Sequence, residues 1–411
     1  MLERHLEGPL RAALADTPAV VLVGARQCGK STLCQALTGS RFRAQSLTFD
    51  DAAVLAAAKA DPAGFIAALD GPVVLDEIQQ APELLPAVKL AIDRHRQPGR
   101  FLLTGSANVL ALPQVAESLV GRAEVLTLWP FSQGELDGHR ERFVEALFSE
   151  RPPVYPGKGE SRAALVRRVL RGGYPEVVAR RDEDRRRSWF GAYVTTILQR
   201  DVRDLASIES LPALPRLLSL VAARSASLLN FAELSRASGL PQTTLKRYMA
   251  LLEHTFLVRT VPAWSANLSK RFVKTPRVML TDTGLLAYLR GTSEPGLRAN
   301  PVDLGPLFES FVAMEIVKLL SWSRVHATLF HYRTHGGEEV DFVLEADAGR
   351  LAGIEVKAAA TVTAADFKGL KALQAALGPR FVRGVVLYTG AEAVPFGPRL
   401  WAVPLDALWK L

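Results

Sequence analysis

Short apolar runs alternate with helical patterns over residues 1–145 of this chain. Such alternation is typical of strands joined by helices in an open parallel sheet. We expect strands at Ala19–Val23, Ser46–Phe49, Val73–Asp76, Phe101–Thr104 and Glu124–Leu128, with a helix at Ser31–Leu37. The pattern therefore predicts an α/β core in the first third of the chain.

Helical patterns dominate the middle of the chain. Residues 149–160 are rich in Pro and Gly and indicate a linker or exposed loop. Helices are expected from Arg162 to about Ala223, with an interruption at Gly172–Pro175. Residues 230–253 then show two helices around a turn at Gly239, followed by an extended Phe256–Val261. This order predicts a winged helix-turn-helix.

The last part of the chain changes to strand patterns. A helix at Pro306–Leu320 precedes a predicted meander, and a helix and a further strand follow it. The meander strands are Ala327–Arg333, Glu339–Glu345 and Leu351–Lys357, and the later elements are Ala365–Leu377 and Val382–Tyr388. We therefore divide the chain into a core (1–145), an arginine-rich helical region (146–225), a winged helix-turn-helix (226–295) and a C-terminal α/β domain (296–411).

The composition of the chain limits the classes of protein to which it can belong. The chain has 411 residues, 48% of them hydrophobic, which is ample for several folded cores. It contains no apolar run of 18 residues or more, and its N-terminus lacks the basic start and apolar core of a signal peptide. We expect a cytoplasmic protein without a membrane span, in which Cys28 and Cys34 are small buried residues.

The net charge of +8 is compatible with a polyanionic partner. Nine arginines lie within residues 162–187, where Asp182, Glu183 and Asp184 balance them in part. A solvated helical face and a nucleic-acid contact both explain this cluster, and the sequence leaves both open.

The strongest chemical signal follows the first predicted strand, where Gly24-x-x-x-x-Gly29-Lys30-Ser31 matches a phosphate-binding loop. The glycines let backbone N–H groups face phosphate oxygens, Lys30 supplies a cation, and Ser31 supplies a hydroxyl for Mg²⁺. The helix that follows points its N-terminal dipole at the same anion. We expect ATP to contact Gly24, Ala25, Arg26, Gln27, Cys28, Gly29, Lys30, Ser31 and Thr32.

A second motif supports the first, because the strand at Val73–Asp76 ends in two carboxylates. Asp76 stands where such proteins hold Mg²⁺, and Glu77 is placed to activate the attacking water as a general base. Thr104, Ser106 or Asn108, at the end of the next strand, could orient the γ-phosphate or the water. The alternative for this last segment is a strand-to-helix turn capped by Ser106.

Arg122 lies just before the fifth predicted strand. It could stabilise transition-state charge in its own subunit or, in a homo-oligomer, in a neighbouring one. The alternative is an ion pair with a surface carboxylate.

The second helix of the predicted helix-turn-helix displays polar side chains that suit phosphates and base edges. These are Gln242, Thr243, Thr244, Lys246 and Arg247. DNA is therefore an expected partner, although such domains also make protein contacts.

Four residues of the C-terminal domain have the types found in metal-dependent phosphodiesterases. Glu355 and Lys357 share a strand face, a neighbouring strand can bring Asp341 alongside, and Glu309 could complete the set. The carboxylates would hold a second Mg²⁺ beside Lys357, and His331, Arg333 and His335 could line a groove. A salt-bridged strand pair in a non-catalytic domain explains the same residues.

The ordered motifs resemble those of a prokaryotic family of AAA-type ATPases of the archaeal and origin-recognition-like branch, joined to a C-terminal domain. The matching segments are GARQCGKST (24–32), VVLDEIQ (73–79), FLLTGSAN (101–108), SLVGR (118–122), GGYPEV (172–177), YVTTILQRDVRDL (193–205), GPLFESFVAMEI (305–316), EVDFVL (339–344) and IEVK (354–357). The resemblance implies a core in which the strand ending at Thr104 lies between those ending at Val23 and Asp76. It also implies a winged-helix module and a C-terminal fold similar to restriction-endonuclease-like nucleases.

We therefore expect a Mg²⁺-dependent ATPase whose nucleotide state repositions the winged-helix and nuclease-like domains, acting on or near DNA. One alternative is an ATP-regulated, metal-dependent DNA endonuclease. Another is a nucleotide-switched signalling or scaffold protein with a protein partner.

Overall fold

The computed structural model describes residues 2–39, 42–106, 119–150, 155, 158–201, 213–334 and 336–411. The chain forms two compact units. The first comprises residues 3–131 with 254–256, and the second comprises residues 132–253 and 257–411. No helix in the described part of the chain is both long and apolar enough to cross a membrane.

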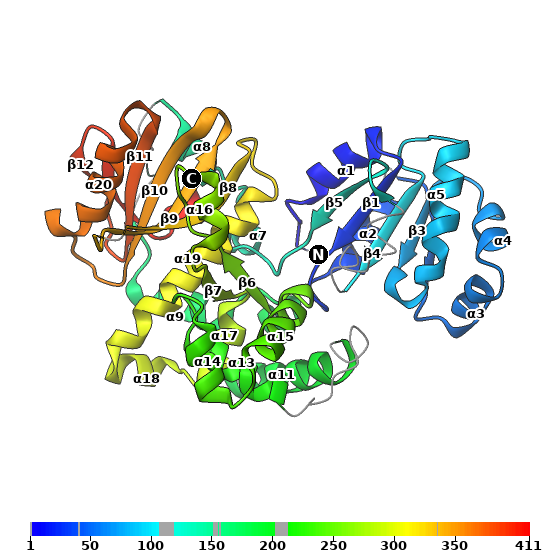
Figure 1. The fold of residues 1–411 in the computed structure, drawn as a ribbon, viewed down its shortest axis with the longest axis horizontal. Coiled ribbons are helices and arrows are strands. Elements are labelled where there is room, and N and C mark those ends of the chain that lie inside the picture. Colours follow the sequence, from blue (N-terminus) through cyan, green and yellow to red (C-terminus); the bar gives the residue numbers. More distant parts are fainter. Residues whose placement is uncertain are drawn as a thin grey trace. The chain divides into compact units, whose positions relative to one another are not determined.

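A five-stranded parallel sheet forms the centre of the first unit (Figure 1). Its order is β2-β3-β4-β1-β5, with β1 at Ala19–Val23, β2 at Gln45–Thr48, β3 at Val73–Asp76, β4 at Phe101–Gly105 and β5 at Ala123–Thr127. β4 lies between β1 and β3, as the family resemblance implied. The carboxyl ends of these three central strands therefore meet at one edge, where ligands bind in open parallel sheets.

Among the described residues of the first unit, one α-helix precedes β1 and four α-helices lie between the strands. They are α1 (Glu7–Asp16), α2 (Lys30–Thr38), α3 (Ala52–Ala60), α4 (Pro62–Ala67) and α5 (Leu85–Arg94). Strands β1 and β4 are buried along their whole length, because helices and neighbouring strands cover them. The expected α/β core is confirmed, and each predicted strand agrees with the structure to within one residue at either end.

The second unit begins with short helices. They are α7 (Gln133–Asp137), α8 (Phe143–Phe148), α9 (Arg162–Arg171), α10 (Pro175–Val178), α11 (Glu183–Thr196) and α13 (Ala213–Ala223), with a π-helical turn at Ile197–Asp201. Ser161 and Asp182 cap α9 and α11 by accepting hydrogen bonds from first-turn N–H groups. The predicted interruption at Gly172 is present: the buried carboxylate of Asp282 accepts the Gly173 N–H at 2.7 Å.

Two helices, α14 (Phe231–Ser238) and α15 (Gln242–His254), follow α13, with Gly239 at φ 76° in the turn between them. β6 (Val258–Val261) then pairs antiparallel with β7 (Arg277–Leu280), a partner strand that the sequence pattern did not reveal. Three more helices complete this region: α16 (Leu268–Val273), α17 (Thr283–Arg290) and α18 (Glu294–Ala299).

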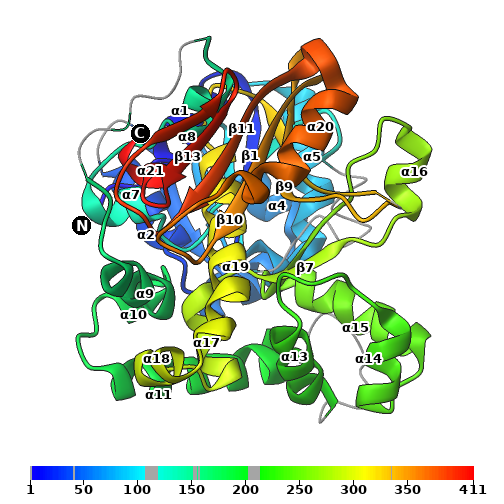
Figure 2. The ribbon, with the colours of Figure 1, turned by 90° about the vertical axis from the view of Figure 1, so that its left-hand side faces the viewer.

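A six-stranded mixed sheet forms the C-terminal part, in the order β12-β13-β11-β10-β9-β8 (Figures 1 and 2). The predicted meander is confirmed, because β8 (Ala327–Arg333), β9 (Glu339–Ala346) and β10 (Arg350–Lys357) pair antiparallel in sequence order. β11 (Phe381–Tyr388) runs parallel to β10, whereas β12 (Val394–Gly397) and β13 (Leu400–Pro404) were not predicted.

Three helices accompany this sheet: α19 (Leu304–Leu320), α20 (Lys368–Leu377) and the short α21 (Ala407–Lys410). The core of the domain includes Leu370 and Leu373 of α20, packed with Val343 of β9, Leu351 of β10 and Val386 of β11. The sheet thus fixes the positions of the carboxylates on β9 and β10.

Candidate nucleotide site and acidic cluster

The phosphate-binding loop lies between β1 and α2, and its backbone requires glycine at two positions. Gly24 has φ 153°, and a Cβ there would lie 2.1 Å from the carbonyl oxygen of Leu128. Gly29 has φ 102° immediately before α2. A side chain at Gly24 would collide with backbone, so the close turn depends on that residue.

Lys30 and the start of α2 form the cationic part of this site. Lys30 is only 5% exposed, and its Nζ donates hydrogen bonds to the carbonyl oxygens of Gly24 and Ala25, each at 3.0 Å. No side chain caps the N-terminus of α2. The loop therefore presents an ammonium group and uncapped helical N–H groups, an arrangement that suits a phosphate.

Oxygen ligands suitable for Mg²⁺ lie beside the loop. The hydroxyl of Ser31 donates to the carboxylate of Asp76, with Oγ 3.0 Å from Oδ2 and 3.3 Å from Oδ1. The Thr104 hydroxyl also donates to Asp76. Because Mg²⁺ prefers oxygen ligands such as a hydroxyl and a carboxylate, Ser31 and Asp76 fit the ion that the ATPase class implies.

Glu77 lies directly after Asp76, in a left-handed backbone conformation with φ 60°. Its N–H donates to Thr104 Oγ1 at 3.2 Å, and its carboxylate accepts a hydrogen bond from the Gln79 amide. The same amide donates to Ser106 Oγ at 3.1 Å. Gln79 thus connects Glu77 to Ser106. Our sequence reasoning gave it no role, although it stands in the VVLDEIQ motif.

The other residues expected at the loop differ in exposure. Gln27 and Thr32 are exposed, and Arg26 is half-buried. Cys28 is buried, with Sγ 3.3 Å from the Leu128 carbonyl, and Cys34 is a second free buried cysteine. Burial raises the pKa of the Cys34 thiol to about 12, which keeps it protonated. Both cysteines are therefore buried fillers, as the sequence predicted.

Arg4 supports the loop from the N-terminal segment, a role that sequence reasoning missed. It is 8% exposed, and its guanidinium donates to the carbonyl of Cys28 at 2.8 Å and to that of Trp129 at 2.5 Å. Its Cζ also lies 4.4 Å from the ring centroid of Phe131. One cation thereby joins the loop to the segment that follows β5.

Arg122 forms a bidentate ion pair with Asp93, with nitrogen–oxygen distances of 2.6 and 2.9 Å. The ion pair that sequence analysis kept as the alternative is the arrangement present in the structure, and a transition-state role for Arg122 stays a prediction. Asn108 and the start of the SLVGR motif at Ser118 lie outside the described residues.

The second predicted site comprises Glu309, Asp341 and Glu355, with Lys357. The structure adds Glu339 to these carboxylates, and we call Glu309, Glu339, Asp341 and Glu355 the acidic cluster. In the antiparallel register of β9 and β10, Ile354 pairs with Phe342, which brings Asp341 next to Glu355. Asp341 Oδ2 accepts the Val356 N–H at 2.9 Å. Asp341 and Glu355 are 9% and 7% exposed, and the expected side-by-side placement is confirmed.

Arg277 of β7 lies among these carboxylates, which the sequence gave no reason to expect. Its Nη1 is 3.2 Å from Asp341 Oδ1 and 3.4 Å from Glu309 Oε2, and its Nη2 donates to Glu339. Arg277 is 5% exposed. Although burial opposes this, the negative charges of Asp341, Glu309 and Glu339 raise the pKa of Arg277 and keep it cationic.

The acidic cluster therefore does not fit a metal ion in this arrangement, because a guanidinium supplies its positive charge. Burial and the neighbouring Asp341 raise the pKa of Glu309 to about 8 and that of Glu355 to about 10. Among the residues that the structure describes, no group of three or more His, Cys, Asp or Glu side chains is arranged to hold a metal. Lys357 points its Nζ to within 4.0 Å of Asp366.

The side chains predicted to line a groove beside this cluster differ in their burial. His331 is 2% exposed, and its Nε2 donates to the Thr275 carbonyl at 3.0 Å, so it packs in the interior instead of lining a groove. Arg333 is exposed at the end of β8, and His335 lies outside the described residues.

On α15, the polar residues expected to face DNA are at the surface: Gln242, Thr243, Lys246 and Arg247 are exposed, and Thr244 is half-buried.

The nine arginines of residues 162–187 divide into two groups. Arg168 pairs with Asp137 and Glu160, and Arg186 donates to backbone carbonyls, so both have structural partners. Others are exposed, including Arg162, Arg181 and Arg185.

Three segments of the chain match known family models. Residues 16–137 match the family model described as an AAA domain. Residues 162–296 and 304–408 match models described as domains of unknown function, DUF8612 and DUF4143. The phosphate loop, Asp76 and Glu77 all lie inside the first match. The chain is therefore an AAA-type P-loop ATPase with two further domains.

The chain belongs to the same family as the uncharacterized proteins Rv2008c of Mycobacterium tuberculosis and Mb2031c of Mycobacterium bovis. It is 32% identical to each over 408 residues, which cover 98% of this chain and 84% of each relative.

Among solved structures, the Walker-type ATPase PABY2304 of Pyrococcus abyssi aligns with a TM-score of 0.45 at 15% identity, over 71% of this chain and 96% of that one. The RuvB Holliday junction branch migration motor of Thermotoga maritima aligns with a TM-score of 0.29 at 16% identity, over 62% of this chain and 89% of that one. Both are distant likenesses.

Proposed function

We propose that this chain hydrolyses ATP with Mg²⁺ at the edge where β1, β3 and β4 end, and that its second unit binds DNA. The observation that carries the ATP part is the convergence of Lys30, Ser31, Asp76 and Glu77 at one sheet edge. A cation, a hydroxyl and two carboxylates in this order are the groups that phosphoryl transfer to water requires.

Each residue has a definite part in the proposed reaction. Lys30 binds the β- and γ-phosphates, and the N-terminus of α2 adds favourable partial charge. Ser31 and Asp76 would hold Mg²⁺, which would supply positive charge against the negative charge that develops on the phosphates. Glu77 accepts a proton from the attacking water. Gln79 positions the Glu77 carboxylate through its hydrogen bond.

DNA binding is proposed for the surface of α15. Its exposed Lys246 and Arg247 suit phosphates, and the exposed Gln242 and Thr243 at its start suit base edges. The order of α13, α14, α15, β6 and β7 is that of a winged helix-turn-helix, which supports the proposal. ATP binding and hydrolysis would then alter how the second unit holds DNA.

The experiment is ATP turnover of the full chain with and without single-stranded, duplex and branched DNA, beside DNA binding measured over a range of salt. We expect DNA to change the turnover rate. Lys246→Gln with Arg247→Gln should flatten the slope of log affinity against log salt by about 2, because each phosphate contact contributes about 1. The matched control is Arg298→Gln with Lys371→Gln, two exposed residues elsewhere, which should leave that slope unchanged. Absence of DNA binding at low salt would favour the signalling or scaffold alternative.

A DNA endonuclease is the second candidate, favoured by Asp341 and Glu355 lying side by side near Lys357. It requires Arg277 to leave the carboxylates. The test is cleavage of plasmid DNA in Mn²⁺ by the parental chain and by Arg277→Gln, with Asp341→Asn as the control. Thermal unfolding checks that Arg277→Gln is folded. Cleavage that persists in Asp341→Asn, or no cleavage by any of these proteins when Arg277→Gln is folded, would exclude this site as a nuclease.

A further inference from the structure

The four residues after β5, Leu128–Phe131, pack directly against the phosphate loop, and we call them the post-β5 segment. The Leu128 N–H donates to the carbonyl of Val23 at 2.8 Å, and the Leu128 carbonyl accepts from the thiol of Cys28 at 3.3 Å. The same carbonyl leaves no room for a side chain at Gly24. All four residues of the segment are buried. Because protein interiors are close-packed, the loop and this segment cannot move independently.

Arg4 joins the loop to the post-β5 segment a second time. Its guanidinium, which is 8% exposed, donates to the carbonyl of Cys28 at 2.8 Å and to that of Trp129 at 2.5 Å. Hydrogen bonds from a charged donor are stronger than neutral ones. Arg4 therefore holds the backbone of the loop in register with the backbone at Trp129.

Residues 254–256 pack within the first unit, although Glu253 and Leu257 on either side of them belong to the second. They include the last residue of α15 and precede β6. Phe256 is 7% exposed and has φ 57°, a backbone conformation that a bulky residue keeps only where its surroundings fix it. Its ring packs edge-on against Trp129, with centroids 5.7 Å apart and an interplanar angle of 81°. The post-β5 segment thus contacts the connection between α15 and β6.

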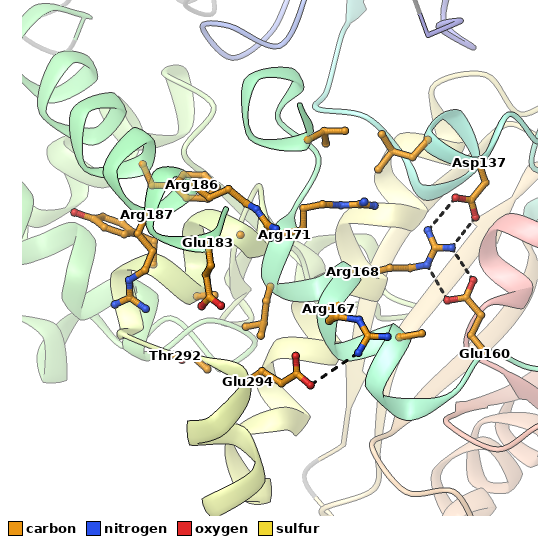
Figure 3. Close-up of a pocket in the computed structure, with 18 of the residues that line it drawn as sticks. Asp137, Glu160, Arg167, Arg168, Arg171, Glu183, Arg186, Arg187, Thr292 and Glu294 are labelled. Carbon is orange, nitrogen blue, oxygen red and sulfur yellow. Dashed lines mark hydrogen bonds and ion pairs between the residues drawn. The ribbon is translucent and has the colours of Figure 1, made fainter. Parts of the chain in front are cut away.

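The other end of the post-β5 segment leads into α7, which is anchored inside the second unit. The Gln133 N–H donates to the buried carboxylate of Glu315 at 2.9 Å. Arg168 of α9 pairs with Asp137 of α7 at 2.8 Å, and Glu160 engages the same guanidinium at 2.7 Å (Figure 3). A displacement of the post-β5 segment is therefore not absorbed by a loose connection at α7.

We propose that Arg4, Trp129 and Phe256 couple the phosphate loop to the connection between α15 and β6, so that ATP binding stabilises the contact between Trp129 and Phe256. This inference rests on the proposed ATP binding, and it supplies a route by which the nucleotide would act on α15. Packed side chains and hydrogen bonds of this kind carry coupling between sites.

The physical basis of this coupling is linkage. ATP binds the ordered loop, which the post-β5 segment holds in place, so bound ATP opposes a local opening that separates Phe256 from Trp129. The effect is reciprocal: whatever loosens this contact weakens ATP binding by the same factor.

Hydrogen–deuterium exchange of the full chain, with and without the ATP analogue AMP-PNP and Mg²⁺, tests the proposal without DNA. In the parental chain, a saturating concentration of the analogue should slow amide exchange in residues 24–32. It should also slow exchange in residues 254–261 by about 5-fold or more. Residues 381–388, in β11, are the internal reference and should not change.

Two substitutions interrupt the connection at different points. With saturating analogue, Phe256→Ala and Arg4→Met should both keep the slowed exchange of residues 24–32 and lose that of residues 254–261. Each should also weaken binding of the analogue about 5-fold or more. The double variant should bind no more weakly than the more affected single variant, because both substitutions break one connection.

Phe65→Ala and Arg11→Met are matched controls in the first unit. Phe65 packs against Phe49 with centroids 6.4 Å apart, and Arg11 pairs with Glu7 at 2.7 Å. Neither pair contains a residue of the phosphate loop or of the post-β5 segment. Both controls should change affinity less than about 2-fold and keep the parental response of residues 254–261.

Thermal unfolding of each variant serves as the folding control. If Phe256→Ala does not fold, Phe256→Leu replaces it, since leucine keeps much of the apolar volume but lacks the ring that packs against Trp129. The same loss of response at residues 254–261 is then expected.

The possible failures can be told apart. A parental chain that binds AMP-PNP without a change of exchange in residues 254–261 would overturn the proposal and leave the ATPase assignment intact. Equal effects in the variants and their matched controls would also overturn it. A parental chain that does not bind AMP-PNP would contradict both this proposal and the proposed ATP site. Coupling in a chain that does not bind DNA would support the proposal and contradict only the DNA part of the proposed function.

Discussion

Replacement of Arg277 by Met should destabilise the second unit strongly. The guanidinium is 5% exposed and lies within 3.4 Å of both Asp341 and Glu309. Met preserves much of the side-chain volume but leaves the buried carboxylate of Asp341 without its cation. Removing one partner of a buried ion pair costs about 3–5 kcal/mol. For a unit of this size the melting temperature should fall by roughly 10 °C.

The measurement is thermal and urea unfolding of the parental chain, Arg277→Met, Asp341→Asn and the double variant. If Arg277 acts as the counter-ion of Asp341, the two substitutions should be non-additive, with a coupling energy of about 1–3 kcal/mol. Arg380→Met is the matched control. Its partner Glu345 lies 3.5 Å away and the Arg380 side chain is 45% exposed, so the loss should stay below about 1 kcal/mol.

Two results would refute this reasoning. One is a loss in Arg277→Met no larger than that in Arg380→Met. The other is strict additivity of Arg277→Met and Asp341→Asn, which would show that the two residues do not stabilise each other.

Three further substitutions test other contacts. Gly24→Ala should abolish ATP binding in equilibrium dialysis, because its Cβ would meet the Leu128 carbonyl at 2.1 Å, and undiminished affinity would contradict this. Arg4→Met should weaken ATP binding with little change in the melting temperature of the second unit, because Arg4 holds the loop through the Cys28 carbonyl. Burial lowers the pKa of His331 from 6.5 to about 4. The unfolded chain therefore binds more protons between these values, and the free energy of unfolding should fall by up to about 3 kcal/mol as pH drops from 6.5 to 4. In His331→Gln, which does not titrate, a scan of melting temperature against pH should lack that part of the decrease.

Much of the first unit could be predicted from sequence because its signals are local. Ala19–Val23 is an unbroken aliphatic run, and the loop that follows has fixed glycine spacing. The meander of β8, β9 and β10 could also be predicted from the sequence, because short connections join strands with a clear pattern. Pairing of β9 with β10 in this meander places Asp341 beside Glu355, so the proximity of these two residues could be predicted as well.

Contacts between distant segments could not be predicted in this way. Arg277 is 64 positions from Asp341, and Arg4 is 125 positions from Trp129. Neither arginine belongs to a periodic pattern or motif, so nothing local marks its partner. Strands β12 and β13 were not predicted for another reason. They are short, and they contain Pro395 and Pro404, a residue type that is rare inside strands.

Single-turnover hydrolysis of radiolabelled ATP by the parental chain and by Glu77→Gln, beside equilibrium ATP binding, tests the assignment of the nucleotide site most directly. Glu77→Gln keeps Lys30, Ser31 and Asp76, so it should bind ATP with Mg²⁺ as tightly as the parental chain. Loss of the general base should reduce hydrolysis about 100-fold or more. Hydrolysis by Glu77→Gln at the parental rate would contradict the proposed role of Glu77.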